Sequence, residues 1–188
     1  MRVGIAGLVG AIAMFIWATI AHVATPLAFA GFERLPDEAA TIATLHASLG
    51  DKPGFYLFPF AAGRDSKSMA DQKARMQLGP SGLIAYQPPG APALMPRQLV
   101  VEFVLELVEA VLTAVLLSFV PGAARRIGVA VGVGVVAAIS TNFSYWNWYG
   151  FSWDYTLATA FTELMKYVVA GVAIVVVLGW PRRPGRAR

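Results

Sequence analysis

The sequence predicts an all-α membrane protein with four transmembrane helices and a small α/β extracytoplasmic cap between the first and second helices. Hydrophobic residues make up 57% of the chain and charged residues 14%, whereas about 25% of residues are charged in a typical soluble domain. Mean hydropathy is +0.60. Four apolar runs, roughly 3–24, 98–120, 126–145 and 156–179, are long enough to cross about 30 Å of hydrocarbon as helices.

The first run is expected to stay in the protein as a transmembrane helix over residues 1–24. The triplet Ala28-Phe29-Ala30 resembles a signal-peptide cleavage site. However, the only positive side chain before the apolar run is Arg2, which is a weak start for a signal peptide.

Residues 25–97 are predicted to form the cap in the order helix, strand, helix, strand. The helices are expected from Pro36 to Leu49 and from Asp65 to Leu78, and the strands over 55–58 and 82–86. About 60 residues are few for an independent core, so we expect the cap to rest on the helix ends or on a partner. Its expected core residues are Leu45, Leu49, Phe55, Leu57, Met76, Leu83 and Ile84.

Positive charges set the expected topology. Arg125 and Arg126 lie between the second and third runs, and four arginines lie in the tail 180–188, whereas the loop predicted over 146–155 has neither lysine nor arginine. Arginine and lysine accumulate in cytoplasmic loops. Both termini are therefore predicted to be cytoplasmic, with the cap and the 146–155 loop outside a bacterial inner membrane.

Composition and motifs exclude several classes of function. The chain has no cysteine, which removes disulfides and thiolate metal sites. The pI of about 9.6 comes largely from arginines next to apolar runs, so no nucleic-acid partner is predicted. Phosphate-loop, Gly-x-Ser-x-Gly and zinc signatures are absent.

Polar side chains inside two of the apolar runs form the candidate site. At 100° per residue, the polar residues of 98–120 fall within roughly 80° of one another, and those of 156–179 form a similar stripe. Charge at bilayer depth is expensive, so the two stripes are expected to face each other. A rise of 1.5 Å per residue puts Glu109 and Lys166 at a similar depth, about 15 Å. The predicted cluster consists of Gln98, Glu102, Glu106, Glu109, Glu163, Lys166, Tyr167, His22 and Asn142.

Two interpretations of this cluster stay open. It is either a structural network, in which Lys166 neutralises one glutamate and others are protonated, or a wet vestibule that binds a cation, relays protons or holds a polar headgroup. One lysine cannot neutralise four carboxylates, which keeps the second interpretation open beside the first. A divalent metal held by Glu102, Glu106 and His22 is a sharper variant. The repeated Glu-x-x-His pattern of di-iron proteins is absent, and no cofactor is predicted.

The connection before the last run is rich in aromatic residues, which prefer the membrane interface. Such a surface is also suited to partner binding. The residues concerned are Tyr145, Trp146, Trp148, Tyr149 and Trp153.

The order of one helix, an outer β-containing segment and three further helices resembles the claudin-like tetraspan plan in architecture, although the Trp-Gly-Leu and paired-cysteine signature of those proteins is absent. The expected function is that of a non-catalytic accessory or assembly subunit of a larger membrane complex. Its partners would be the bilayer and a membrane protein or a second copy of the chain. The alternatives are a small ion- or proton-coupled transporter that uses the carboxylates, or a membrane enzyme acting on a lipid.

Overall fold

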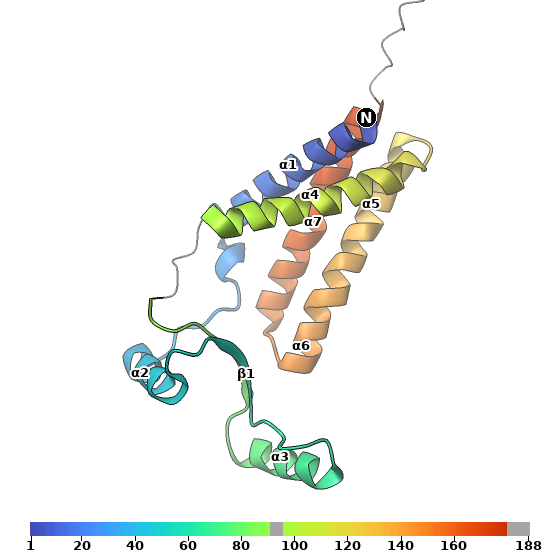
Figure 1. The fold of residues 1–188 in the computed structure, drawn as a ribbon. Coiled ribbons are helices and arrows are strands. Elements are labelled where there is room, and N and C mark those ends of the chain that lie inside the picture. Colours follow the sequence, from blue (N-terminus) through green and yellow to red (C-terminus); the bar gives the residue numbers. More distant parts are fainter. Residues whose placement is uncertain (91–95, 180–188) are drawn as a thin grey trace, which may run out of the picture. The chain divides into compact units, whose positions relative to one another are not determined.

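The computed structural model describes residues 1–90 and 96–179, which form two compact units (Figure 1). Of these residues, 1–32, 96–147 and 151–179 make up the helical unit, and 33–90 with 148–150 make up the cap unit. The predicted cytoplasmic tail, 180–188, lies outside the described residues.

Four long helices build the helical unit: α1 (Arg2–Val23), α4 (Pro96–Ser118), α5 (Ala123–Ala138) and α7 (Trp153–Gly179). Helix α1 packs extensively against both α4 and α7, and α5 packs mainly against α7. Figure 1 shows α5 beside α7, with α4 crossing α7. The first described residue of α4 is proline, whose fixed φ and missing N–H suit the first turn of a helix.

Three helical stretches are long and apolar enough to cross a membrane: Arg2–Val23, Ala123–Tyr149 and Trp153–Gly179. They indicate a membrane protein in general. Helix α4 is also long, but Arg97 and three glutamates interrupt its hydrophobicity. A fourth span is therefore not confirmed.

The helix predicted over 126–145 runs further than expected and changes its winding. After α5 the chain continues as a π-helix, η2 (Ile139–Phe143), and then as α6 (Ser144–Tyr149). Single π turns inside longer helices are often found at functional sites. The sequence pattern did not reveal this turn, because apolar spacing alone does not distinguish α from π winding over five residues.

The loop predicted over 146–155 is mostly helical, so that prediction was wrong. Only three residues separate α6 from α7. Gly150 follows α6 with φ of 71°, a conformation that glycine adopts without strain. The Ser152 hydroxyl oxygen accepts a hydrogen bond from the Tyr155 backbone N–H at 3.2 Å. It thereby caps the first turn of α7, which begins at Trp153.

The cap unit contains α2 (Glu38–Leu49), β1 (Gly54–Phe58), α3 (Ser66–Leu78) and β2 (Gly82–Tyr86). This confirms the predicted order of elements. The strands pair antiparallel, with Tyr56 opposite Ile84. Asp65 caps α3 by accepting from the Ser68 backbone N–H at 3.0 Å and the Ser68 hydroxyl at 2.6 Å. The hydroxyl bond first, and then the backbone bond, hold the pKa of Asp65 below its usual range.

The predicted core of the cap was largely wrong. Phe55 is 70% exposed and Leu57 44% exposed, whereas Tyr86, which was not predicted, is 8% exposed. The better-covered face of the hairpin carries Tyr56, Ile84 and Tyr86. Because the first strand is apolar on both faces, its sequence pattern could not indicate which face is covered.

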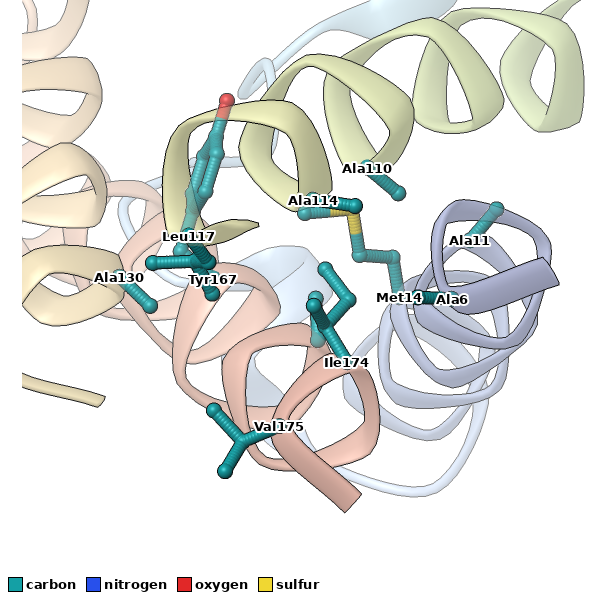
Figure 2. Packing of buried hydrophobic residues seen from close by; sticks show 11 residues of the cluster. Ala6, Ala11, Met14, Ala110, Ala114, Leu117, Ala130, Tyr167, Ile174 and Val175 are labelled. Carbon is teal, nitrogen blue, oxygen red and sulfur yellow. The ribbon is translucent and has the colours of Figure 1, made fainter. Parts of the chain in front are cut away.

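Small residues allow the helices of the helical unit to approach closely. The buried core includes Ala6, Met14, Ala110, Ala130 and Ile174, and Figure 2 shows these side chains between neighbouring helices. An added Cβ at Gly171 of α7 would lie 2.5 Å from the Ala130 Cβ of α5. Close approach of backbones through small residues is typical of helix association in membranes.

This contact generates a first prediction. Gly171→Ala should destabilise the helical unit by about 1–3 kcal/mol, because the extra methyl overpacks the α5–α7 interface. Gly128→Ala, on the same interface helix α5, is the matched control, since its Cβ meets nothing within 4 Å. Thermal unfolding in detergent would measure both variants. Equal melting temperatures of the Gly171→Ala and Gly128→Ala variants would contradict the packing of α5 on α7.

Candidate functional site

The helical unit brings four carboxylates around one ammonium group. Lys166 Nζ lies 3.9 Å from Glu102, 3.7 Å from Glu106, 3.7 Å from Glu109 and 3.6 Å from Glu163. We call these five residues the lysine cluster. Three carboxylates come from α4 and one from α7, so the expectation that the polar stripes of these helices face each other is met.

The helical repeat produces this convergence. Glu102, Glu106 and Glu109 follow one another at spacings of four and three residues, which places them on one face of α4. Glu163 and Lys166 are three residues apart on α7 and form an ion pair within that helix. One stripe on each helix is therefore sufficient to assemble the cluster.

Burial differs strongly within the lysine cluster. Glu106 is fully buried and the Lys166 side chain is 9% exposed, whereas the Glu102 side chain is 49% exposed. Both Glu106 carboxylate oxygens and Glu109 Oε2 are buried without a hydrogen-bond partner in the described part of the chain. With all four carboxylates ionised, the cluster would carry three uncompensated negative charges. Buried charge is costly unless it is neutralised, so protons or an external cation must supply the balance.

One pocket opens beside Glu102, Glu163 and Lys166, with a volume of about 460 Å³. We call it the Glu102 pocket. Helices α1, α4 and α7 contribute to it, together with η2 and the short 3₁₀ helix η1 (Pro26–Phe29). Its remaining lining residues are Ala18, Ala21, His22, Leu27, Ala28, Phe32, Asn142, Tyr155, Thr159 and Thr162.

A second pocket, of about 320 Å³, reaches the lysine cluster from the side of Glu109. It is lined by Tyr167 and by residues of the π-helix, including Ser140 and Asn142. Glu163 and Asn142 line both pockets. Figure 2 shows the Tyr167 ring next to the apolar core, with its hydroxyl pointing away from that core.

Helix α1 fixes the position of α7 close to the lysine cluster. The Trp17 indole N–H donates a hydrogen bond to the Thr162 backbone oxygen at 3.0 Å. The Trp17 ring also meets the Phe161 ring edge-on, with centroids 6.2 Å apart. These contacts lie one turn before Lys166 on α7.

The structure does not bring together the metal ligands suggested by the sequence. Among residues 1–90 and 96–179, no three His, Asp or Glu side chains are grouped closely enough to hold a metal ion. The set of Glu102, Glu106 and His22 is not such a group in the described residues. His22 instead lines the Glu102 pocket and bonds the Ala18 oxygen through Nδ1 at 2.9 Å. Gln98 is exposed in the first turn of α4 and is not among the lining residues of either pocket.

The predicted aromatic residues divide between the two units. Trp146 stacks on Trp153 with ring centroids 4.4 Å apart, and Tyr145 meets Phe151 at 5.5 Å. These ring pairs join α6 to the start of α7. Trp148 and Tyr149 belong to the cap unit, where they line a pocket with residues of the hairpin.

Several residues of the Glu102 pocket were not predicted from the sequence, among them Thr162 and Phe32. Thr162 lies outside the recognised stripe, and Phe32 lies in the segment treated as cap. No strong sequence signal indicates that η1 returns the chain to α7, so this placement could not be predicted.

Comparison with known proteins gives no family for the chain. No protein-family model matches it, and neither the curated proteins nor the solved structures contain a significant match. The class of protein is therefore defined by the fold and the site alone. It is a helical membrane protein with an acidic, lysine-centred cluster between two of its helices.

The geometry generates a second prediction. Lys166→Met should destabilise the protein by about 3–5 kcal/mol, because it leaves the buried Glu106 facing other carboxylates without a counter-charge. Adding Glu106→Gln should recover a large part of that loss. Adding Glu102→Gln should recover less, since the Glu102 side chain is half exposed.

Thermal unfolding of the single and double variants as a double-mutant cycle would measure this coupling. Glu109→Gln alone should be mild, because three other carboxylates still surround Lys166. Strict additivity of Lys166→Met and Glu106→Gln would contradict a shared cluster.

Proposed function

We propose that the chain is a non-catalytic integral inner-membrane protein that serves as an accessory or assembly subunit of a larger membrane complex. The observation that carries this proposal is the apolar surface of the cap unit. Among its described residues, Tyr86 is the only large apolar side chain that is buried.

The hairpin of the cap needs an external surface for stability. Two-stranded sheets are marginal on their own in water. One face of this hairpin exposes Phe55 and Leu57, and Phe60, Ile42 and Leu78 are also exposed. Such a concentration of apolar surface on a small unit is typical of an interaction site. A protein partner would cover it and provide the core that the cap does not have.

The proposed topology has four spans, with α4 crossing the bilayer although it carries three glutamates. Pairing with Lys166 offsets part of the cost of these side chains. Arg125 and Arg126 flank the α4–α5 turn, which favours a cytoplasmic position for that turn and both termini and an outer position for the cap.

A second candidate function is an ion- or proton-coupled transporter. The excess of carboxyl groups over ammonium groups and the two pockets that reach Glu102, Glu109 and Glu163 favour this candidate, because such groups mark ion and proton pathways in membrane proteins. A lipid-directed enzyme is the weaker alternative, since it rests on the same carboxylates and on no further observation.

A third prediction tests the subunit proposal. In native membranes, residues 33–90 should resist limited proteolysis, and in the purified chain in detergent they should be cleaved rapidly. Liposomes containing only the purified chain separate the possible sources of protection. Protection restored by lipid alone would contradict a protein partner, whereas continued cleavage would support one.

A fourth prediction tests the topology. Single cysteines introduced at Ser68 and at Ala124 should react with a membrane-impermeant maleimide from opposite sides of the membrane, because the cap and the α4–α5 turn are separated by one span, α4. The absence of native cysteine makes the labelling specific. Labelling of both positions from the same side would exclude α4 as a span.

A further inference from the structure

We propose that the Glu102 pocket binds the ammonium group of an amine ligand that carries an apolar body. This inference goes beyond the subunit role and does not depend on it. It follows from the hydrogen-bonding atoms that remain available in the pocket once the bonds within the protein are formed.

The two threonines of the pocket have already used their hydrogens. The Thr159 hydroxyl donates to the Tyr155 backbone oxygen at 2.7 Å, and the Thr162 hydroxyl donates to the Ala158 backbone oxygen at 2.8 Å. A hydroxyl has one hydrogen and two lone pairs. Each of these oxygens can therefore only accept a hydrogen bond from a ligand.

Asn142 and His22 each also present a hydrogen-bond acceptor atom. Asn142 Nδ2 donates one hydrogen to the Ala138 oxygen at 3.0 Å, which leaves its amide oxygen as an acceptor and one N–H as a donor. His22 Nδ1 lies 2.9 Å from the Ala18 oxygen. A carbonyl oxygen only accepts, so Nδ1 carries the hydrogen, and Nε2 of the neutral ring is an acceptor.

The charged groups of the pocket are also unbalanced, with more negative groups than positive ones. Glu102 and Glu163 line it as carboxylates, while Lys166, which also lines it, is shared among four carboxylates at 3.6–3.9 Å. Glu106 does not line the pocket, but it is fully buried and lies 3.7 Å from Lys166, so it takes a share of the same ammonium group. The site has acceptors and negative charge in excess. A primary ammonium group supplies both a positive charge and three N–H donors.

Size and lining favour an organic amine over a bare ion. The volume of about 460 Å³ lies within the range of small-molecule sites, and the described acidic and histidine residues form no metal-sized group. Ala21, Leu27 and Phe32 provide an apolar wall of the pocket. Phe32 packs edge-on against Tyr155 with ring centroids 5.4 Å apart, which gives that wall a fixed aromatic surface for an alkyl chain.

Ligand binding to the purified full-length chain tests the proposal. The chain would be placed in nanodiscs of phosphatidylglycerol, whose headgroup has no amine, and titrated with n-butylammonium. Tetramethylammonium keeps the charge without N–H donors, and n-butanol keeps the apolar body without the charge. Both controls should bind at least about tenfold more weakly than n-butylammonium.

A second set of discs identifies the source of the amine. If phosphatidylethanolamine in the disc competes with n-butylammonium, the natural ligand is a lipid headgroup. If it does not compete, the ligand is a free amine. Both results support ammonium recognition. No saturable n-butylammonium binding in phosphatidylglycerol discs, or equal binding of n-butanol, would overturn it.

Matched variants locate the site. Glu163→Gln should weaken n-butylammonium binding by about tenfold, and Thr162→Val, which keeps the side-chain shape but removes the accepting oxygen, should weaken it severalfold. Thr19→Val is the control, because Thr19 makes the same kind of hydroxyl bond to its own helix but is not among the lining residues of the pocket. If Glu163→Gln does not fold, Thr162→Val carries the test. Unchanged affinity in Thr162→Val would refute the site. The site would also be refuted if Thr19→Val weakened binding as much as Thr162→Val does.

Discussion

The helical unit depends on the ion pairs that the Lys166 ammonium group forms with the surrounding carboxylates. Helices α4 and α7 contact each other much less than α1 contacts either of them. The three α4 carboxylates around Lys166 therefore form a large part of the direct link between α4 and α7. Gly10 of α1 lets that helix lie close to both α4 and α7, since an added Cβ there would lie 3.3 Å from Ala110 and 2.9 Å from Ile174. The Trp17 bond to the Thr162 backbone then holds α7 in position one turn away. Packing and charge are thus mutually dependent: the alanine and glycine contacts set the spacing that the ion pairs require.

The same cluster explains why a structural role and a binding role do not exclude each other. One ammonium is enough to join the two helices, but it is not enough to satisfy four carboxylates. The surplus acceptors border two pockets, one through Glu102 and one through Glu109. The π-helix adds Asn142 to both pockets. An arrangement built only for stability would be expected to pair its buried polar atoms. The Glu106 carboxylate has an ion pair with Lys166 but no hydrogen bond among the described residues, which points to a role beyond joining helices.

The sequence predicted the long helices and the facing stripes because both depend on the helical repeat and on the cost of charge in lipid. It did not predict that Glu102 and Glu106 both reach Lys166, since side-chain reach is set by the crossing of α4 and α7. It placed the cap residues Phe55 and Leu57 in the core, because β1 is apolar on both faces. The covered face is decided by tertiary contacts such as those of the Tyr86 hydroxyl with His46 and Gly50. The sequence also predicted a loop over 146–155. The helices there depend on the contact of the Trp146 ring with the Trp153 ring and on the Ser152 cap, and an aromatic-rich run does not indicate either of them.

The order of the charged residues along the chain has a consequence for biosynthesis. Glu106 precedes Lys166 by sixty positions in the printed sequence. At about 5–20 residues per second, α4 leaves the ribosome roughly 3–12 seconds before its counter-charge is made. In the four-span topology, the three α4 glutamates must spend that interval protonated, shielded within the insertion machinery, or waiting at the membrane surface. In that topology α7 is the helix that commits α4 to the bilayer, so a chain truncated before Lys166 is expected to leave α4 without a stable place in the membrane.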